Sequence, residues 1–269
     1  MKFRILAIFS ICLMVRTLKS ETSSNWISYS SSTINQYGVY HFRKSFHVAD
    51  VPETLFLKIS ADNKYILYVN GKQVSSGPAK GDLITYKYDL VDIASYLLKG
   101  KNVFAAQVYN AGLDKPLSFV GLQTAFLIQP VDSTCQIKTD KTWKTYRNRA
   151  YRPVSYKQML QPAWFYGFYA SGCGDEISMQ KYPTGWEKPD FDDGKWKNAV
   201  ELDVKTCQKW NLVPGNLAKL DKTTVFPVKI RESVNAIISG SLSENNLKIT
   251  IPAYTKSTIL FDFENMTYG

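Results

Sequence analysis

The sequence predicts an all-β protein organised as a β-sandwich, and three observations support this prediction. Apolar residues recur with a period of two in several short runs, for example at residues 65–69, and this period is typical of strands. Aromatic residues make up 14% of the 269 residues, and they are enriched in strands. Beyond the amino terminus, no long stretch repeats its apolar residues with the period of a helix.

Residues 60–74 form the clearest predicted element, a strand that leads into a hairpin. The apolar residues of 65–69 alternate with residues that are also large, so we expect a central strand that is buried on both faces. Asn70 and Gly71 follow this strand directly. Both accept positive φ, which a two-residue type I′ turn requires. We therefore expect the chain to fold back at residues 72–74.

Residues 40–48 alternate as a core strand does. Phe42 and Phe46 share the face that we expect to point into the core, and His41 and His47 fall on the other face. These are the only two histidines, and at ordinary strand rise they lie about 20 Å apart, too far to share a metal ion. Further strands are expected at 55–59, 84–89, 102–109, 125–128, 226–230, 247–251 and 258–263, with a short helical turn in 91–98 that ends at Gly100.

Residues 1–20 have the layout of a secretory signal peptide, a basic start followed by a short apolar run. This run is too short to span a bilayer, so we expect no membrane span and export of the remaining chain to the periplasm or the extracellular space. Without the four basic residues of the leader, the formal net charge falls from +10 to +6. The other bases are scattered among acids, so nucleic acid is not an expected partner.

Removal of the leader leaves three cysteines, Cys135, Cys173 and Cys207. An odd number in an exported chain allows at most one internal disulfide. Cys173 with Cys207 is the first pair to test. Because the sequence has no Cys-x-x-Cys spacing, a zinc site is not expected.

Composition divides the remaining chain into four parts. Residues 21–36 are a Ser- and Thr-rich lead-in, of which Trp26 and Ile27 are expected to dock on the sandwich. Residues 37–130 carry the first sandwich. Residues 131–225 are loop-rich and form a second unit, and residues 226–269 supply strands of a further β unit, which we expect to be truncated.

Several short motifs, taken in their order, resemble one family of carbohydrate-active enzymes. The motifs are Asn25-Trp-Ile27, Phe42-Arg-Lys-Ser-Phe46, Ser60-Ala-Asp62, Tyr68-Val-Asn-Gly71, Gly77-Pro78, Tyr88-Asp89 and Gly100-Lys-Asn102, followed by residues 140–153, Gly185-Trp186, Phe191-Asp-Asp193 with Trp196, and residues 210–214. This order is similar to the amino-terminal region of bacterial α-L-rhamnosidases, glycoside hydrolase family 78. The resemblance covers residues 25–269. It implies a galactose-binding-like jelly-roll β-sandwich at 37–130 and a second, loop-rich β-sandwich region at 131–225.

The resemblance also implies where catalysis takes place. In this family a downstream (α/α)₆ barrel hydrolyses the substrate with two acidic residues, and no long helical region exists in this chain. Asp192 and Asp193 are the most conspicuous acidic pair, but adjacent side chains point apart in an extended chain. Phe191-Asp-Asp-Gly194 is better explained as a turn stabilised by a side chain. We therefore expect no catalytic residue and no activity of this chain alone.

Two functional hypotheses from different classes follow. The chain is either the non-catalytic accessory portion of an exported α-L-rhamnosidase-like hydrolase, partnered by the catalytic barrel and acting on rhamnose-containing plant or microbial polysaccharides, or a free-standing carbohydrate-binding protein of the same fold. A structural or adhesive surface protein is a third reading that the sequence leaves open. In the first two, carbohydrate is the expected partner.

Candidate binding residues come from loops. Trp164, Tyr166 and Trp186 offer rings that could stack on a sugar, and the alternative is that they fill the interface between the two sandwiches. Asp62 and Asn63 could bind a structural calcium ion or a sugar, and the alternative is that they only form a turn. No other cofactor is expected.

Overall fold

The computed structural model describes residues 25–264 except 31, 114, 117, 133–134, 155–173, 204–209, 219–222 and 243–245. The chain divides into two compact units, residues 1–217 and 218–269. Secondary structure in the described part is almost entirely β, with short 3₁₀ turns η1 (Ala94–Tyr96) and η2 (Met179–Lys181). The prediction of an all-β protein is confirmed. None of the helices in this part is long and apolar enough to cross a membrane.

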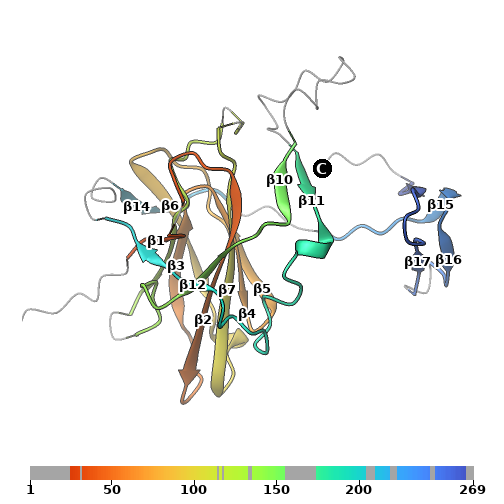
Figure 1. The fold of residues 1–269 in the computed structure, drawn as a ribbon. Helices are drawn as coiled ribbons and strands as arrows, with labels where there is room; N and C mark the ends of the chain where they lie inside the picture. Colours follow the sequence, from red (N-terminus) through yellow and green to blue (C-terminus); the bar gives the residue numbers. More distant parts are fainter. Residues whose placement is uncertain are drawn as a thin grey trace, which may run out of the picture. The chain divides into compact units, whose positions relative to one another are not determined.

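Two six-stranded sheets form the first unit (Figure 1). The first sheet has the order β13 (Val200–Glu201), β1 (Ile27–Ser28), β8 (Phe126–Pro130), β3 (Phe56–Ala61), β6 (Thr85–Asp92) and β14 (Asn211–Pro214). The second has the order β12 (Lys197–Asn198), β9 (Lys144–Arg147), β2 (Gly38–Val48), β7 (Gly100–Asn110), β4 (Lys64–Val69) and β5 (Lys72–Gly77). A separate hairpin consists of β10 (Tyr151–Pro153) and β11 (Asp175–Ile177).

The predicted hairpin at Asn70 and Gly71 is confirmed. Their φ angles are 52° and 81°, and Val69 pairs directly with Lys72, as a two-residue turn between β4 and β5 requires. The Asn70 side chain also accepts from the Val103 backbone N–H at 2.9 Å. β4 is not central, however, because only β5 lies between it and the sheet edge; β2 and β7 occupy the middle of the sheet.

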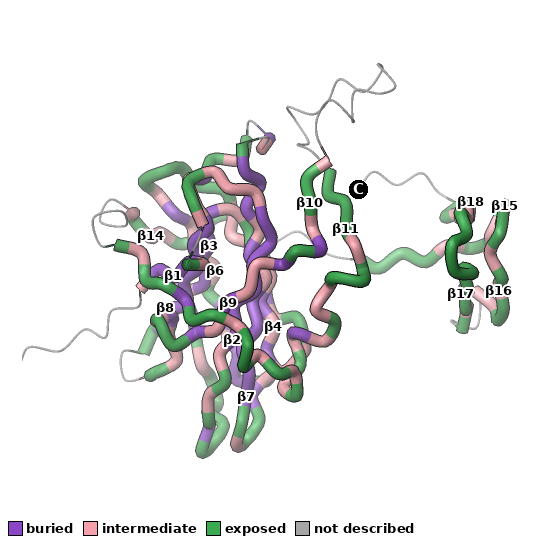
Figure 2. Tube along the Cα trace, viewed as in Figure 1, coloured by how far each residue is buried: buried purple, intermediate pink, exposed green. Residues whose placement is uncertain are grey.

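The core lies between the two sheets, and buried residues gather along β2, β4 and β7 (Figure 2). Tyr65 and Leu67 are almost completely buried there, since alternate side chains of a strand point to the same face. Trp143, also fully buried, packs its ring 6.1 Å from Phe104 and 5.8 Å from Phe126. A residue from beyond position 130 thus sits at the centre of the first core.

The described residues of the range 131–225 do not form the expected second sandwich. The described strands β9, β12, β13 and β14 all join the two sheets of the first unit; β9 pairs with β2, and β14 pairs in parallel with β6. The lead-in contributes as well, because Ile27 is fully buried and pairs with Phe126. The extent of the sandwich is decided by strand pairing between segments that are distant in the sequence, and local composition gives no information on such pairing.

Part of the outer face of β2 is buried. His41 and Arg43 are 0% and 1% exposed, because residues 182–196 cover them. The Trp186 ring centroid lies 3.9 Å from that of His41. Arg43 donates hydrogen bonds to the backbone oxygens of Trp186, Lys188 and Phe191. This face of the sheet is thus partly covered by a segment far away in the sequence.

The described residues of the second unit form four short strands. β15 (Lys229–Val234) pairs with β18 (Thr258–Asp262), and β16 (Ile237–Ser239) pairs with β17 (Lys248–Thr250), both antiparallel. The strands expected at 247–251 and 258–263 are confirmed by β17 and β18. The strand expected at 226–230 instead begins at Lys229 and continues to Val234, and β16 was not predicted.

Candidate functional site

A groove with a volume of about 510 Å³ lies on the uncovered part of the second sheet's outer face. Four adjacent strands contribute to it, since Gln107 on β7 pairs with Ile66 on β4, which pairs with Ser76 on β5, and Val39 on β2 pairs with Tyr109 on β7. The groove is lined by Val39, Lys64, Tyr65, Ile66, Ser76, Gly77, Pro78, Gln107, Tyr109, Tyr151 and Asp175.

The hairpin of β10 and β11 contributes Tyr151 and Asp175 to this groove. Tyr37 donates its hydroxyl hydrogen to Asp175 Oδ1 at 2.6 Å, and its ring stands edge-on to Tyr109, with the centroids 6.1 Å apart. Burial, together with the Asp175 carboxylate, raises the pKa of Tyr37, so the hydroxyl stays protonated and continues to donate. The Asp175 carboxylate is thereby held in place beside the groove.

Both half-buried aromatic rings and polar groups line the groove. Tyr109 and Tyr151 are of intermediate exposure, and Gln107, Ser76 and Asp175 offer an amide, a hydroxyl and a carboxylate. Sites for small polar molecules combine apolar walls with a few placed hydrogen-bonding groups. This arrangement can therefore orient a ligand that has both an apolar face and hydroxyls.

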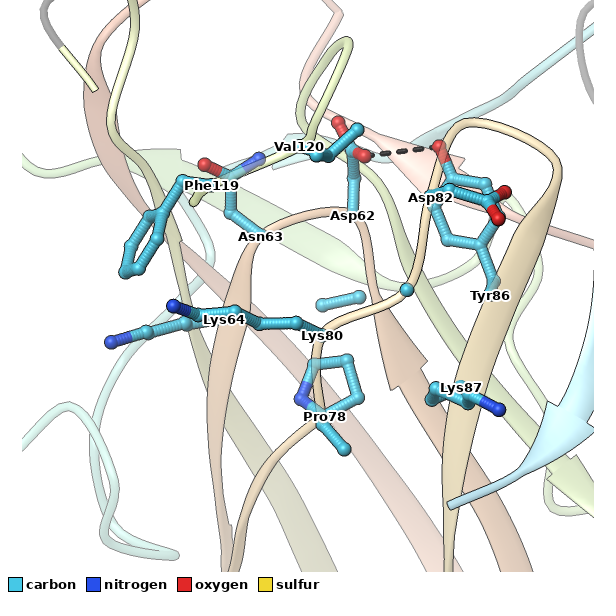
Figure 3. Close-up of a pocket in the computed structure, with 13 residues that line it drawn as sticks. Asp62, Asn63, Lys64, Pro78, Lys80, Asp82, Tyr86, Lys87, Phe119 and Val120 are labelled. Atoms are coloured by element: carbon cyan, nitrogen blue, oxygen red, sulfur yellow. Dashed lines mark hydrogen bonds between the residues drawn. The ribbon is translucent and has the colours of Figure 1, made fainter. Parts of the chain in front are cut away.

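A second, smaller pocket adjoins the groove, because Lys64 and Pro78 line both (Figure 3). Its volume is about 30 Å³. The Lys64 and Lys80 ammonium nitrogens lie 4.5 and 4.7 Å from the centroid of the Phe119 ring. Asp62 and Tyr86 form another wall, joined by a 3.0 Å hydrogen bond from the Tyr86 hydroxyl to Asp62 Oδ1.

Asp62 and Asn63, the predicted calcium or sugar ligands, hold neighbouring loops. Asp62 is 6% exposed and accepts hydrogen bonds from the backbone N–H groups of Leu122 and Gln123, and burial raises the pKa of its carboxyl. Asn63 Oδ1 accepts from the Ala111 N–H at 3.1 Å. These oxygens accept hydrogen bonds from the protein itself, which favours the interpretation that Asp62 and Asn63 form a turn. The described residues contain no group of three or more His, Cys, Asp or Glu side chains suited to a metal ion.

Trp186 does not offer a stacking surface. It is 2% exposed, with His41 against its ring and Tyr68 5.5 Å away in an edge-on contact, and its Nε1 donates to the Tyr182 hydroxyl at 3.2 Å. The prediction that it stacks on a sugar is corrected to a structural role, on the outer face of the sheet and not between two sandwiches. Trp164 and Tyr166 lie outside the described residues, as do Cys173 and Cys207.

Asp192 and Asp193, the adjacent acidic pair, both accept hydrogen bonds from other residues of the fold. Asp192 Oδ1 accepts from the Gly194 N–H at 2.9 Å, which confirms the predicted side-chain-stabilised turn. Asp193 Oδ2 accepts from Arg43 Nε at 2.9 Å.

His41 is neutral, because burial lowers its pKa to about 3, and its Nε2 lies 3.0 Å from Asn148 Nδ2.

Sequence reasoning missed the residues that line the groove. Alternation within 102–109 places Gln107 and Tyr109 on the face opposite Val108, so the outward direction of these two side chains was readable. No local signal marks Tyr151 or Asp175, since their position depends on how the hairpin packs against the sheet.

Comparison with known proteins places this geometry in context. No family model and no curated protein matches the sequence. Among solved structures, the chain is similar to the GH78 family rhamnosidase of Bacillus sp. GL1, with 26% identity and a TM-score of 0.64 over 80% of this chain and 22% of that one. It is also similar to the α-L-rhamnosidase of Aspergillus terreus, with 17% identity and a TM-score of 0.50 over 80% of this chain and 24% of that one. The latter likeness is one of fold alone. The chain therefore spans less than a quarter of the length of either enzyme.

Proposed function

We propose that this chain is a non-catalytic carbohydrate-binding module that accompanies a glycoside hydrolase similar to α-L-rhamnosidases. The observation that carries the proposal is the groove with Tyr109 and Tyr151 in its wall, on a sandwich similar to part of a GH78 rhamnosidase. Its carbohydrate partner is a rhamnose-containing polysaccharide, and its protein partner is a catalytic (α/α)₆ domain.

The chemistry of the groove suits a sugar. A sugar ring has an apolar face that packs on aromatic side chains and hydroxyls that need hydrogen-bonding partners. Tyr109 and Tyr151 supply the rings, and Gln107 and Asp175 supply an amide and a carboxylate. The volume of about 510 Å³ lies within the range of roughly 300–1,000 Å³ that is typical of small-molecule sites.

The described lining of the groove has too few carboxylates for inverting hydrolysis, which supports a role in binding. Inverting hydrolysis needs two carboxyl groups about 6.5–9.5 Å apart across the scissile bond. In the described lining, Asp175 is the single carboxylate, and Asp193 is occupied by Arg43. The proposed role is to hold the polysaccharide near a catalytic domain.

Export belongs to the same proposal. Polysaccharides of this kind lie outside the cytoplasm, and residues 1–20 have the composition of a secretory leader. Finding the chain in the cytoplasmic fraction of its native cells, with residues 1–20 retained, would contradict this part of the proposal.

Isothermal titration of the purified chain with L-rhamnose and with rhamnose-containing oligosaccharides tests binding. We expect saturable heats, which are lost in Tyr151→Ala because the ring is in the groove wall. Tyr254→Ala is the matched control, since that tyrosine is fully exposed in the second unit. Flat heats for every sugar, or equal loss in both variants, would contradict a binding role for the groove.

A further inference from the structure

Two lysines share one aromatic ring at the pocket beside the groove. Lys64 begins β4, and Lys80 lies in the loop that follows β5. Figure 3 shows both side chains extending side by side toward Phe119, with their nitrogens 4.5 and 4.7 Å from its ring centroid. Lys80 also donates to Ser118 Oγ at 2.9 Å. Two positive charges thus converge on one small surface.

No carboxylate in the described part of the chain forms an ion pair with Lys64 or Lys80. The two acids in the pocket lining have other partners. Asp62 accepts from backbone N–H groups and from Tyr86, and Asp82 Oδ1 accepts from the Ile84 and Thr85 N–H groups at 2.7 and 2.6 Å. Neither carboxylate forms an ion pair with Lys64 or Lys80, so both ammonium groups remain able to bind an anionic ligand.

The unliganded arrangement has an electrostatic cost. Partial burial lowers the pKa of the Lys64 ammonium, and the neighbouring charge of Lys80 lowers it further. Like charges that are brought together on a protein surface disfavour each other's charged form. A bound anion between or beside the two ammonium groups would reverse this effect.

The size of the pocket limits what can enter it. At about 30 Å³ it is far smaller than the roughly 300 Å³ of a site for a whole small molecule, so a charged substituent fits where a sugar ring does not. The adjoining groove has room for the ring, and Lys64 and Pro78 line both spaces. A ring and its acidic substituent can thus occupy the two spaces together.

We propose that Lys64 and Lys80 bind the anionic substituent of an acidic carbohydrate, the carboxylate of a uronic acid or a sulfate ester, while its sugar ring lies in the groove. This inference rests on the proposed carbohydrate-binding function and specifies its ligand class. Phe119 holds the two ammonium groups in position through cation–π contacts. Binding depends on salt concentration, because the lysines are exposed and their attraction is screened.

Titration with matched oligosaccharides tests the inference. The probes are an oligosaccharide of alternating rhamnose and galacturonic acid, the same oligosaccharide with its carboxyl groups reduced to alcohols, and the reduced form carrying sulfate esters. We expect the acidic form to bind about tenfold or more tightly than the reduced form, and this advantage to shrink at high salt. Comparison of the carboxylated and sulfated forms identifies which anion is preferred.

Variants locate the effect at the pocket. In a Lys64→Gln, Lys80→Gln double variant, we expect the acidic and reduced forms to bind equally. Lys58→Gln is the matched control, because that ammonium also lies over an aromatic ring, 5.3 Å from the Tyr88 centroid, and Lys58 does not line the pocket. This variant should keep the advantage. A thermal melt checks that each variant is folded.

The outcomes separate this inference from the proposed function. If the wild-type chain binds acidic and reduced forms equally, or if the double variant keeps the advantage, the lysine pair does not recognise the anion while the groove still binds sugar. If neither form binds, the proposed function itself is overturned, and this inference with it.

Discussion

Arg43 Nε and Asp193 Oδ2 form an ion pair at 2.9 Å that joins β2 to a loop 150 residues later in the chain. The Arg43 side chain is 1% exposed and that of Asp193 is 24% exposed. The same guanidinium donates to three backbone oxygens of the loop. This side chain therefore links β2 to the segment that covers His41 on the outer face of the sheet.

We expect Asp193→Ala to lower the free energy of unfolding by roughly 3 kcal/mol, because it leaves the buried Arg43 charge without its partner. Urea unfolding followed by tryptophan fluorescence measures this. Asp192→Ala is the control, since it removes only the hydrogen bond to the Gly194 N–H in an exposed turn. Equal effects of the two substitutions would contradict a special role for the pair.

Gly71→Val should destabilise the first unit by about 1–2 kcal/mol, since Gly71 has a φ of +81° and a side chain disfavours the left-handed region. The measurement is the melting temperature. Gly174→Val is the matched control, because Gly174 has nothing within 4 Å of an added Cβ and no positive φ. An unchanged melting temperature for Gly71→Val would count against the turn.

Stability should depend on the protonation of His41. Burial lowers its pKa to about 3, below the value of roughly 6.5 for an unfolded chain. Between these values the unfolded state binds the proton and the folded state does not, so the free energy of unfolding falls as the pH falls from about 6.5 toward 3.

Urea unfolding at pH 7 and pH 5 tests this dependence. His41→Gln should reduce the loss of stability between the two pH values, because an amide does not titrate there. His47→Gln, at the exposed histidine of the same strand, should leave the loss as it is in the wild type. A His41→Gln variant with the wild-type pH dependence would show that other groups cause it.

Calcium should leave the melting temperature unchanged. The oxygens of Asp62 and Asn63 accept hydrogen bonds from the N–H groups of Leu122, Gln123 and Ala111, so they are engaged as acceptors by the protein itself. Thermal melts with added calcium and with a chelator measure this. A rise with calcium that disappears in Asp62→Asn would restore the calcium interpretation.

The chain alone should not hydrolyse an aryl α-L-rhamnoside. Asp192 holds a turn and Asp193 pairs with Arg43, so neither is free to act as the acid or base of an inverting reaction. Release of the aryl group by the purified chain measures activity. Turnover that persists through purification and disappears in Asp192→Ala would contradict the non-catalytic assignment.

The sequence by itself determined the features that depend on neighbouring residues. The turn at Asn70 and Gly71 follows from the φ angles that these two residues accept. The short helical turn before Gly100 and the turn held by Asp192 follow from equally local chemistry. The alternation of residues 65–69 predicted the strand, but the expected burial on both faces is wrong: Tyr65, Leu67 and Val69 are buried, whereas Ile66 and Tyr68 on the other face are half-buried.

Only the tertiary structure decided which distant segments meet. Whether residues beyond 130 would form a second sandwich or complete the first depended on the pairing of β9 with β2 and of β14 with β6. The burial of Trp186 required Arg43 to bind the loop that carries it, and the groove required a hairpin to bring Tyr151 to the sheet. A turn is specified by the φ and ψ of a few adjacent residues, whereas strand pairing and packing are settled by contacts across the whole chain, which no local pattern encodes.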